Sequence, residues 1–235
     1  MGSDKLNKLK SLLTELDKKN ISYVSWKDNS DLKTVFKGEG DIDIFIPNEN
    51  KKRFIELSKS LGWIELINPI ANHPWTSHFY GLGDSLEIFH VHAYFKIITG
   101  ETWLKEYLLP LDKWMIENRV WSSDHEIWVM NNLSQCYLFL IRHLLKGGSF
   151  SSRLIYKINL QSYEEEWKAC SIGIRSEEIR GPIDLSKYLI GTRVFEEKFQ
   201  LPKISTSILF RLSASLFLRY NLFSLPLRRI HSFCI

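Results

Sequence analysis

The sequence predicts an α+β fold, in which a mixed β-sheet flanked by helices is followed by a helical C-terminal region. Its 235 residues are 44% hydrophobic, 13% aromatic and 25% charged, a balance typical of a globular chain with a sizeable core. Up to about residue 130, segments that alternate like strands are interspersed with segments of helical spacing. Beyond that point only helical patterns remain. We therefore expect an α/β domain over 1–130 and a helical region over 131–235.

The first elements follow from hydrophobic periodicity. Leucines at helical spacing predict an amphipathic helix over 4–20, and residues 21–26 are typical of a short strand. The segment DIDIFIP, residues 41–47, predicts a second strand. Because side chains alternate along a strand, Asp41 and Asp43 should share one face and the three isoleucines the other. This strand therefore offers two carboxylates on one side and isoleucines to a core on the other.

The remaining elements are bounded by glycines and turn residues. A helix over 48–61 should end at Gly62, and the turn GLGD at 81–84 suits a hairpin. The other predicted strands are 63–67, 77–80, 85–94 and 126–130, and the other predicted helices are 134–146, 151–168, 184–189, 193–199 and 205–225.

Charge and cysteine content restrict the class of protein. The formal net charge is +4, from 31 Lys+Arg and 27 Asp+Glu, an excess too small to indicate nucleic-acid binding. Three cysteines without CxxC spacing disfavour a disulfide framework or a structural zinc site. The chain shows no signal-peptide core and no uncharged apolar run long enough to cross a bilayer. We therefore expect a cytoplasmic protein.

The C-terminal segment is apolar and basic. No acidic residue follows Glu197, and the segment 205–225 carries Arg211 and Arg219 within an apolar sequence. Three interpretations stay open: a helix buried against the domain, a helix lying on anionic lipid with its arginines at the surface, or a face that binds a partner. The second would give peripheral membrane contact through residues 204–235.

The segment GEGDIDIFI, residues 38–46, carries the functional hypothesis. Asp41 and Asp43 should have Cα atoms about 7 Å apart on one strand face, close enough for a shared divalent cation. Two carboxylates this close repel each other unless they are solvated or bind a cation, and Mg²⁺ suits carboxylate oxygens best. Gly38 and Gly40 precede them, where backbone can approach a phosphate. The alternative is a pair of acids on a solvated strand edge.

The order of these elements, with paired aspartates on a strand, resembles the nucleotidyltransferase superfamily typified by DNA polymerase β. Within it, the chain is most similar to the small aminoglycoside and lincosamide nucleotidyltransferases and to relatives encoded with polysaccharide genes. The resemblance covers residues 5–167. It implies a nucleotidyltransferase-like sheet domain and a bound nucleoside triphosphate.

The resemblance also implies a set of site residues. Asp41 and Asp43 correspond to the metal-binding pair, and Glu87, in SLEIFHVH, to the third acid that completes the Mg²⁺ or Mn²⁺ site or takes the proton of the acceptor. The residues that correspond to the nucleotide-binding positions are Ser25, Lys27, Gly40, Arg153 and Lys157. Of the family's glycine-serine element only the serine is present.

The resemblance implies transfer of a nucleoside monophosphate to a hydroxyl of a small acceptor, such as a sugar or polysaccharide precursor. The alternative is a catalytically inactive relative that serves as a binding or regulatory protein, at a membrane if the C-terminal segment contacts lipid. The enzymatic hypothesis requires Asp41, Asp43 and Glu87 to gather around one cation.

Two histidines on the strand that follows Glu87 form a second candidate group. His90 and His92 alternate with Val91, so they share a face and could chelate zinc. By the same alternation both lie opposite Glu87. Core or substrate-facing histidines are the alternative.

Overall fold

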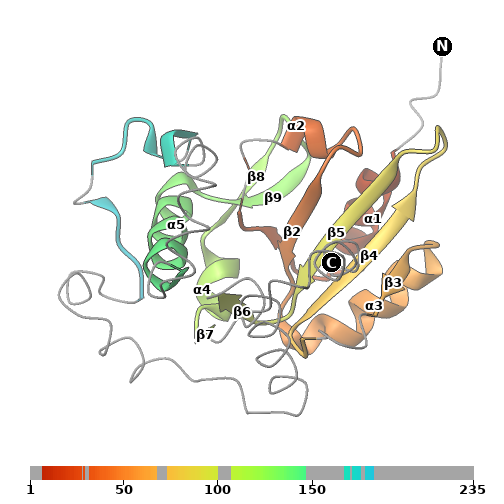
Figure 1. Ribbon diagram of the computed structural model, residues 1–235, viewed down its shortest axis with the longest axis horizontal. Helices are drawn as coiled ribbons and strands as arrows, with labels where there is room; N and C mark the ends of the chain where they lie inside the picture. Colours follow the sequence, from red (N-terminus) through yellow and green to blue (C-terminus); the bar gives the residue numbers. More distant parts are fainter. Residues whose placement is uncertain are drawn as a thin grey trace, which may run out of the picture.

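The computed structural model describes residues 7–27, 29, 32–67, 73–99, 107–146, 167–169, 171–175 and 178–182. These form a mixed α+β structure with a seven-stranded sheet and flanking helices (Figure 1). In chain order the elements are α1 (Lys8–Lys18), β1 (Val24–Ser25), α2 (Leu32–Val35), β2 (Asp41–Phe45), the 3-10 turn η2 (Asn48–Asn50), α3 (Lys51–Ser60), β3 (Ile64–Leu66), β4 (Thr76–Leu82), β5 (Ile88–Tyr94), β6 (Ile97–Thr99), β7 (Tyr107–Leu109), α4 (Asp112–Glu117), β8 (Arg119–Ser122), β9 (Ile127–Met130) and α5 (Asn132–Lys146).

The large sheet has the strand order β3-β4-β5-β2-β1-β9-β8, and β6 pairs with β7 separately. Strand β2 runs parallel to β5, and β1 runs parallel to β9, while the other neighbours in the sheet are antiparallel. The parallel pairing of β2 with β5 brings together segments more than forty residues apart in sequence, with Asp41 opposite His90 and Asp43 opposite His92.

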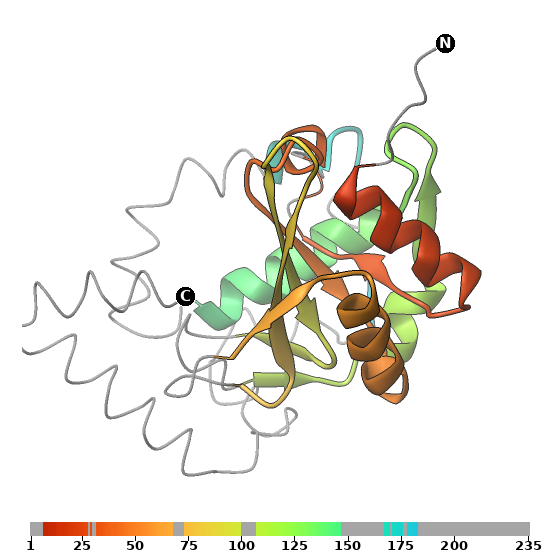
Figure 2. The same cartoon turned by 90° about the vertical axis from the view of Figure 1, so that its right-hand side faces the viewer.

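One face of the sheet packs on α1 and α3. Helix α1 begins after Asn7, whose side-chain oxygen accepts a hydrogen bond of 2.8 Å from the Lys10 N–H, as an N-cap residue does. The buried residues of this core come from both helices and from alternate positions of the strands: they include Leu9, Leu12, Leu13, Leu16, Ile42, Ile44, Ile46, Phe54, Phe79, Phe89, Val91 and Ala93. Figure 2 shows α1 and α3 on one side of β4 and β5.

The opposite face forms a second core with β6, β7, α4 and α5. Its buried residues include Val24, Trp26, Phe45, Tyr94, Ile97, Ile98, Leu109, Met115, Met130, Tyr137, Leu138 and Ile141. Helix α5 therefore packs in the same core as β1 and β2. This second core covers one end of the sheet face that carries Asp41 and Asp43.

The structure confirms the predicted mixture of strands and helices, and it contains elements that the sequence patterns did not indicate. The helix over 8–18, the strands over 41–45, 64–66 and 127–130 and the helix over 132–146 agree with prediction. Elements α2, β6, β7, α4 and β8 were not predicted. The β4–β5 turn contains Gly83 and Asp84 of the predicted GLGD turn but extends beyond it, because β4 continues through Leu82 and the Leu86 N–H, at φ of 71°, donates to the Gly83 carbonyl.

Several predictions fall outside the described residues. These are the helices over 184–189, 193–199 and 205–225, most of the helix over 151–168 and the lipid-contact hypothesis for 204–235. Among the helices of the described ranges, none combines the length and hydropathy needed to cross a membrane.

Candidate functional site

The alternation in DIDIF places the two aspartates as predicted. Ile42 and Ile44 lie in the core beneath α1 and α3, so Asp41 and Asp43 face the other side of the sheet. Asp41, at the start of β2, is exposed, whereas Asp43 is only 6% exposed. A buried carboxylate needs charged or hydrogen-bonding partners, because burial without them is costly.

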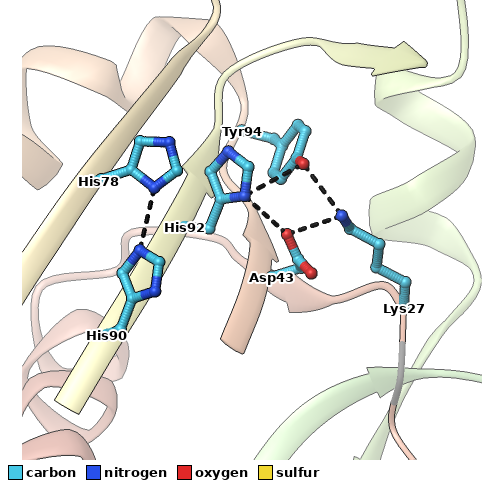
Figure 3. A network of polar contacts seen from close by, with 6 residues as sticks. All are labelled: Lys27, Asp43, His78, His90, His92 and Tyr94. Atoms are coloured by element: carbon cyan, nitrogen blue, oxygen red, sulfur yellow. Dashed lines mark hydrogen bonds and ion pairs between the residues drawn. The ribbon is translucent and has the colours of Figure 1, made fainter. Parts of the chain in front are cut away.

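Asp43 is paired with a lysine and a histidine (Figure 3). Its Oδ1 lies 2.9 Å from Lys27 Nζ and 3.0 Å from His92 Nδ1. Lys27 Nζ also donates a hydrogen bond of 3.0 Å to the Tyr94 hydroxyl and lies over the rings of Trp26 and Tyr94, at 5.3 and 4.9 Å from their centroids. The lysine therefore sits in an aromatic cage beside a buried carboxylate.

These contacts perturb the titration of both partners. Burial acts to raise the pKa of Asp43, but the Lys27 ammonium and the His92 imidazole outweigh it and hold this pKa well below its usual range. For Lys27, burial acts to lower the pKa, and the negative charge of Asp43 outweighs it, so the pKa is raised. Both groups are charged at neutral pH.

Asp41, Asp43 and His92 together have the composition of a metal site. One ligand atom from each of the three lies within 4.8 Å of the ligand atoms of the other two. The set supplies two carboxylate oxygens and one imidazole nitrogen, held on adjacent parallel strands. Divalent cations bind such mixed oxygen and nitrogen sets in proteins.

A row of stacked rings continues the same sheet face across β5 and β4. His78 lies opposite His92, and Tyr80 opposite His90. The ring centroids are 4.1 Å apart for His78 and His92 and 4.4 Å apart for Tyr80 and His90. His78 Nδ1 and His90 Nε2 lie 2.9 Å apart, and a dashed line in Figure 3 marks this contact. Burial lowers the pKa of His90 from 6.5, against the opposing effect of Asp41 and Asp43.

The structure does not bring Glu87 to this site, which corrects the expectation that it is the third acid. Glu87 lines a cavity of about 290 Å³ together with Phe89 and Lys8, on the α1 side of the sheet. Its Oε2 accepts a hydrogen bond of 3.2 Å from the Ser85 N–H. His92, from the strand that Glu87 precedes, stands beside the aspartates instead.

The predicted nucleotide-binding residues are placed in different settings. Ser25 is fully buried on β1, and its Oγ donates a hydrogen bond of 2.6 Å to Asn29 Oδ1. Gly40 has φ of 107° just before Asp41, a conformation that favours glycine. Arg153 and Lys157 lie outside the described residues.

Sequence reasoning identified Lys27 and the aspartates but assigned no role to His78 or Tyr94. His92 was recognised as half of a possible zinc pair, not as a neighbour of Asp43. The parallel register of β2 and β5 was the missing information, and no local sequence signal specifies it.

Comparisons of the chain with protein-family models, with curated proteins and with solved structures gave no match.

Proposed function

We propose that this protein is a metal-dependent nucleotidyltransferase that moves a nucleoside monophosphate from a nucleoside triphosphate to a hydroxyl of a small acceptor. The supporting observation is the convergence of Asp41, Asp43 and His92, with ligand atoms within 4.8 Å of one another. Paired carboxylates on a strand of a mixed sheet also support the nucleotidyltransferase-like fold expected from the resemblance. The acceptor class proposed is a sugar or polysaccharide precursor.

The donor atoms present fit a divalent cation. Asp43 Oδ1 and His92 Nδ1 are 3.0 Å apart. Two ligands at about 2.0–2.2 Å from a metal and at a right angle to each other are separated by about 3 Å. Asp41, exposed at the start of β2, would hold the cation from the solvent side, and Mg²⁺ and Mn²⁺ are both candidates. A cation bound there supplies positive charge that stabilises the transferred phosphoryl group.

The chain's own residues would perform the remaining tasks. Lys27, 17% exposed, carries an ammonium that can stabilise a phosphate oxygen once its contact with Asp43 is exchanged. Gly40 leaves the backbone before Asp41 open to close approach by a ligand.

The first test is ligand-induced stabilisation. We expect Mg²⁺ or Mn²⁺ together with one of the four nucleoside triphosphates to raise the melting temperature, because a ligand that binds only the folded state stabilises it. Asp41→Asn with Asp43→Asn should abolish the increase, whereas Glu87→Gln, on the other side of the sheet, should retain it. Transfer of an α-phosphate label to sugar acceptors then tests the chemistry.

The second candidate function is a catalytically inactive relative that binds a ligand or partner. Two observations favour it: Lys27 neutralises Asp43, and the hydroxyl of Ser25 is engaged by Asn29. In this case none of the four triphosphates, with either cation, changes the melting temperature. That result would contradict the enzymatic proposal.

A further inference from the structure

We propose that His78 and His90 form a separate binding site for a late first-row transition-metal ion, of the class of Co²⁺, Ni²⁺, Cu²⁺ and Zn²⁺. The two histidines come from neighbouring antiparallel strands, β4 and β5, and lie diagonally on one sheet face. Neither belongs to the group formed by Asp41, Asp43 and His92, and the site does not depend on nucleotidyl transfer.

The separation of the two ring nitrogens fits a shared metal ion. His78 Nδ1 and His90 Nε2 are 2.9 Å apart. Metal–imidazole bonds are about 2.0–2.1 Å, so two nitrogens at adjacent, right-angled positions of a metal lie about 2.9 Å apart. The two nitrogens face each other along a hydrogen bond, with ring centroids 5.2 Å apart, so each ring must turn before both lone pairs meet at one metal ion.

Stacking orders both rings before a metal ion binds. His78 packs face to face on His92, at an interplanar angle of 20°, and His90 packs on Tyr80, at 3°. A site whose ligands are already ordered loses less conformational entropy on binding. Both histidines are half-buried, so the pair is partly accessible to solvent.

The charge around the pair favours a cation. The carboxylates of Asp41 and Asp43 both act electrostatically on His90, and Lys27 is paired with Asp43 on the far side of His92 (Figure 3). Two carboxylates against one ammonium leave a net negative charge beside the imidazoles. The nitrogen donors select the metal, since imidazole suits late transition ions whereas Mg²⁺ prefers oxygen ligands.

Calorimetric titration of the full chain with NiCl₂ or ZnCl₂, without nucleotide, tests the proposal. The His78→Asn/His90→Asn variant should lose one bound equivalent or bind at least tenfold more weakly. The matched control is His125→Asn, since His125 stacks on Phe36 away from this face, and it should bind as the wild type does. The proposal is overturned if the double variant retains wild-type stoichiometry and affinity.

Two further measurements keep the result interpretable. The Asp41→Asn/Asp43→Asn variant should still bind Ni²⁺ through the histidines. A wild-type protein that binds Ni²⁺ but no triphosphate would support this site and contradict the proposed function. Pulsed electron paramagnetic resonance of the wild type with one equivalent of Cu²⁺ needs no variant. Coupling of the Cu²⁺ electron spin to nitrogens of two imidazoles supports the site. Coupling to fewer than two imidazoles, or no binding of Cu²⁺, overturns it.

Discussion

Asp43 shows how a single buried charge depends on its surroundings. Its carboxylate is paired with Lys27 and His92. The side chain of Asp43 is 7% exposed and that of Lys27 is 17% exposed. Removing one partner of a buried pair leaves the other charge without compensation, which costs far more than removing both. Breaking the pair is therefore expected to cost much more stability than the intact pair contributes.

We expect Lys27→Met to lower the free energy of unfolding by up to about 3–5 kcal/mol, the usual cost of breaking a buried ion pair, since only His92 then remains beside Asp43. Lys27→Met combined with Asp43→Asn should recover most of this loss, since no charge is then stranded. Urea unfolding of the two variants and the wild type provides the comparison. Equal stability of the single and double variants would contradict a buried ion pair.

His90 predicts how stability depends on pH. Burial lowers its pKa in the folded protein below 6.5, and this outweighs the opposing charges of Asp41 and Asp43. As pH falls below that value, the unfolded chain takes up a proton that folded His90 does not, so folding becomes less favourable. This loss of stability continues until the pH falls below the lowered pKa of His90 in the folded protein. In metal-free buffer, His90→Asn should lose less stability than the wild type between pH 7 and pH 5, and His125→Asn should serve as control.

At the scale of elements, β2 and its neighbours separate what alternation can predict from what it cannot. The pattern DIDIF correctly predicts which residues share a face, because side-chain alternation is local. Alternation also correctly places His90 and His92 together. It cannot say that this face of β5 is the one that meets Asp41 and Asp43, because a parallel register between distant strands is set by the packing of both sheet faces. The sequence therefore points to Glu87, whereas the structure places His92 beside the two aspartates.

Short elements were missed for a related reason. Strands β6 and β7 have three residues each, too few for a period-two pattern to be distinguished from an apolar loop. They are buried in one core with α4, which follows β7 directly, and with α5, which begins more than twenty residues further along the chain. Tertiary contacts rather than local preference determine these strands.

Gly81 on β4 provides a test of packing between elements. A Cβ atom at this position would lie 2.9 Å from two ring carbons of Trp63, which is itself buried. We expect Gly81→Ala to destabilise the fold by about 1–3 kcal/mol, because the tryptophan must move in a well-packed core. Thermal unfolding measures the effect. In a Trp63→Leu background, Gly81→Ala should lower the melting temperature less than it does in the wild type. An equal decrease in both backgrounds would exclude the contact with Trp63 as the cause.

For the whole molecule, the sheet joins two cores that share no helix. Ile44 of β2 lies in the core with α1 and α3, and its neighbour Phe45 lies in the core with α4 and α5. Adjacent residues of one strand thus hold both cores, so neither should unfold without disturbing the other. Such coupling is expected to make 1–130 and α5 one cooperative unit, although the change in sequence pattern falls near residue 130.

We expect Leu12→Ala, in the first core, and Ile141→Ala, in the second, each to lower the stability of the same transition by about 2–5 kcal/mol, the usual cost of truncating a large buried aliphatic side chain. Both residues are at most 1% exposed. Urea unfolding followed by far-ultraviolet circular dichroism and by tryptophan fluorescence should give coincident curves for each variant. If Ile141→Ala instead produces a separate early transition, with the midpoint of the main one unchanged, α5 unfolds independently and the site face loses its covering before the sheet melts.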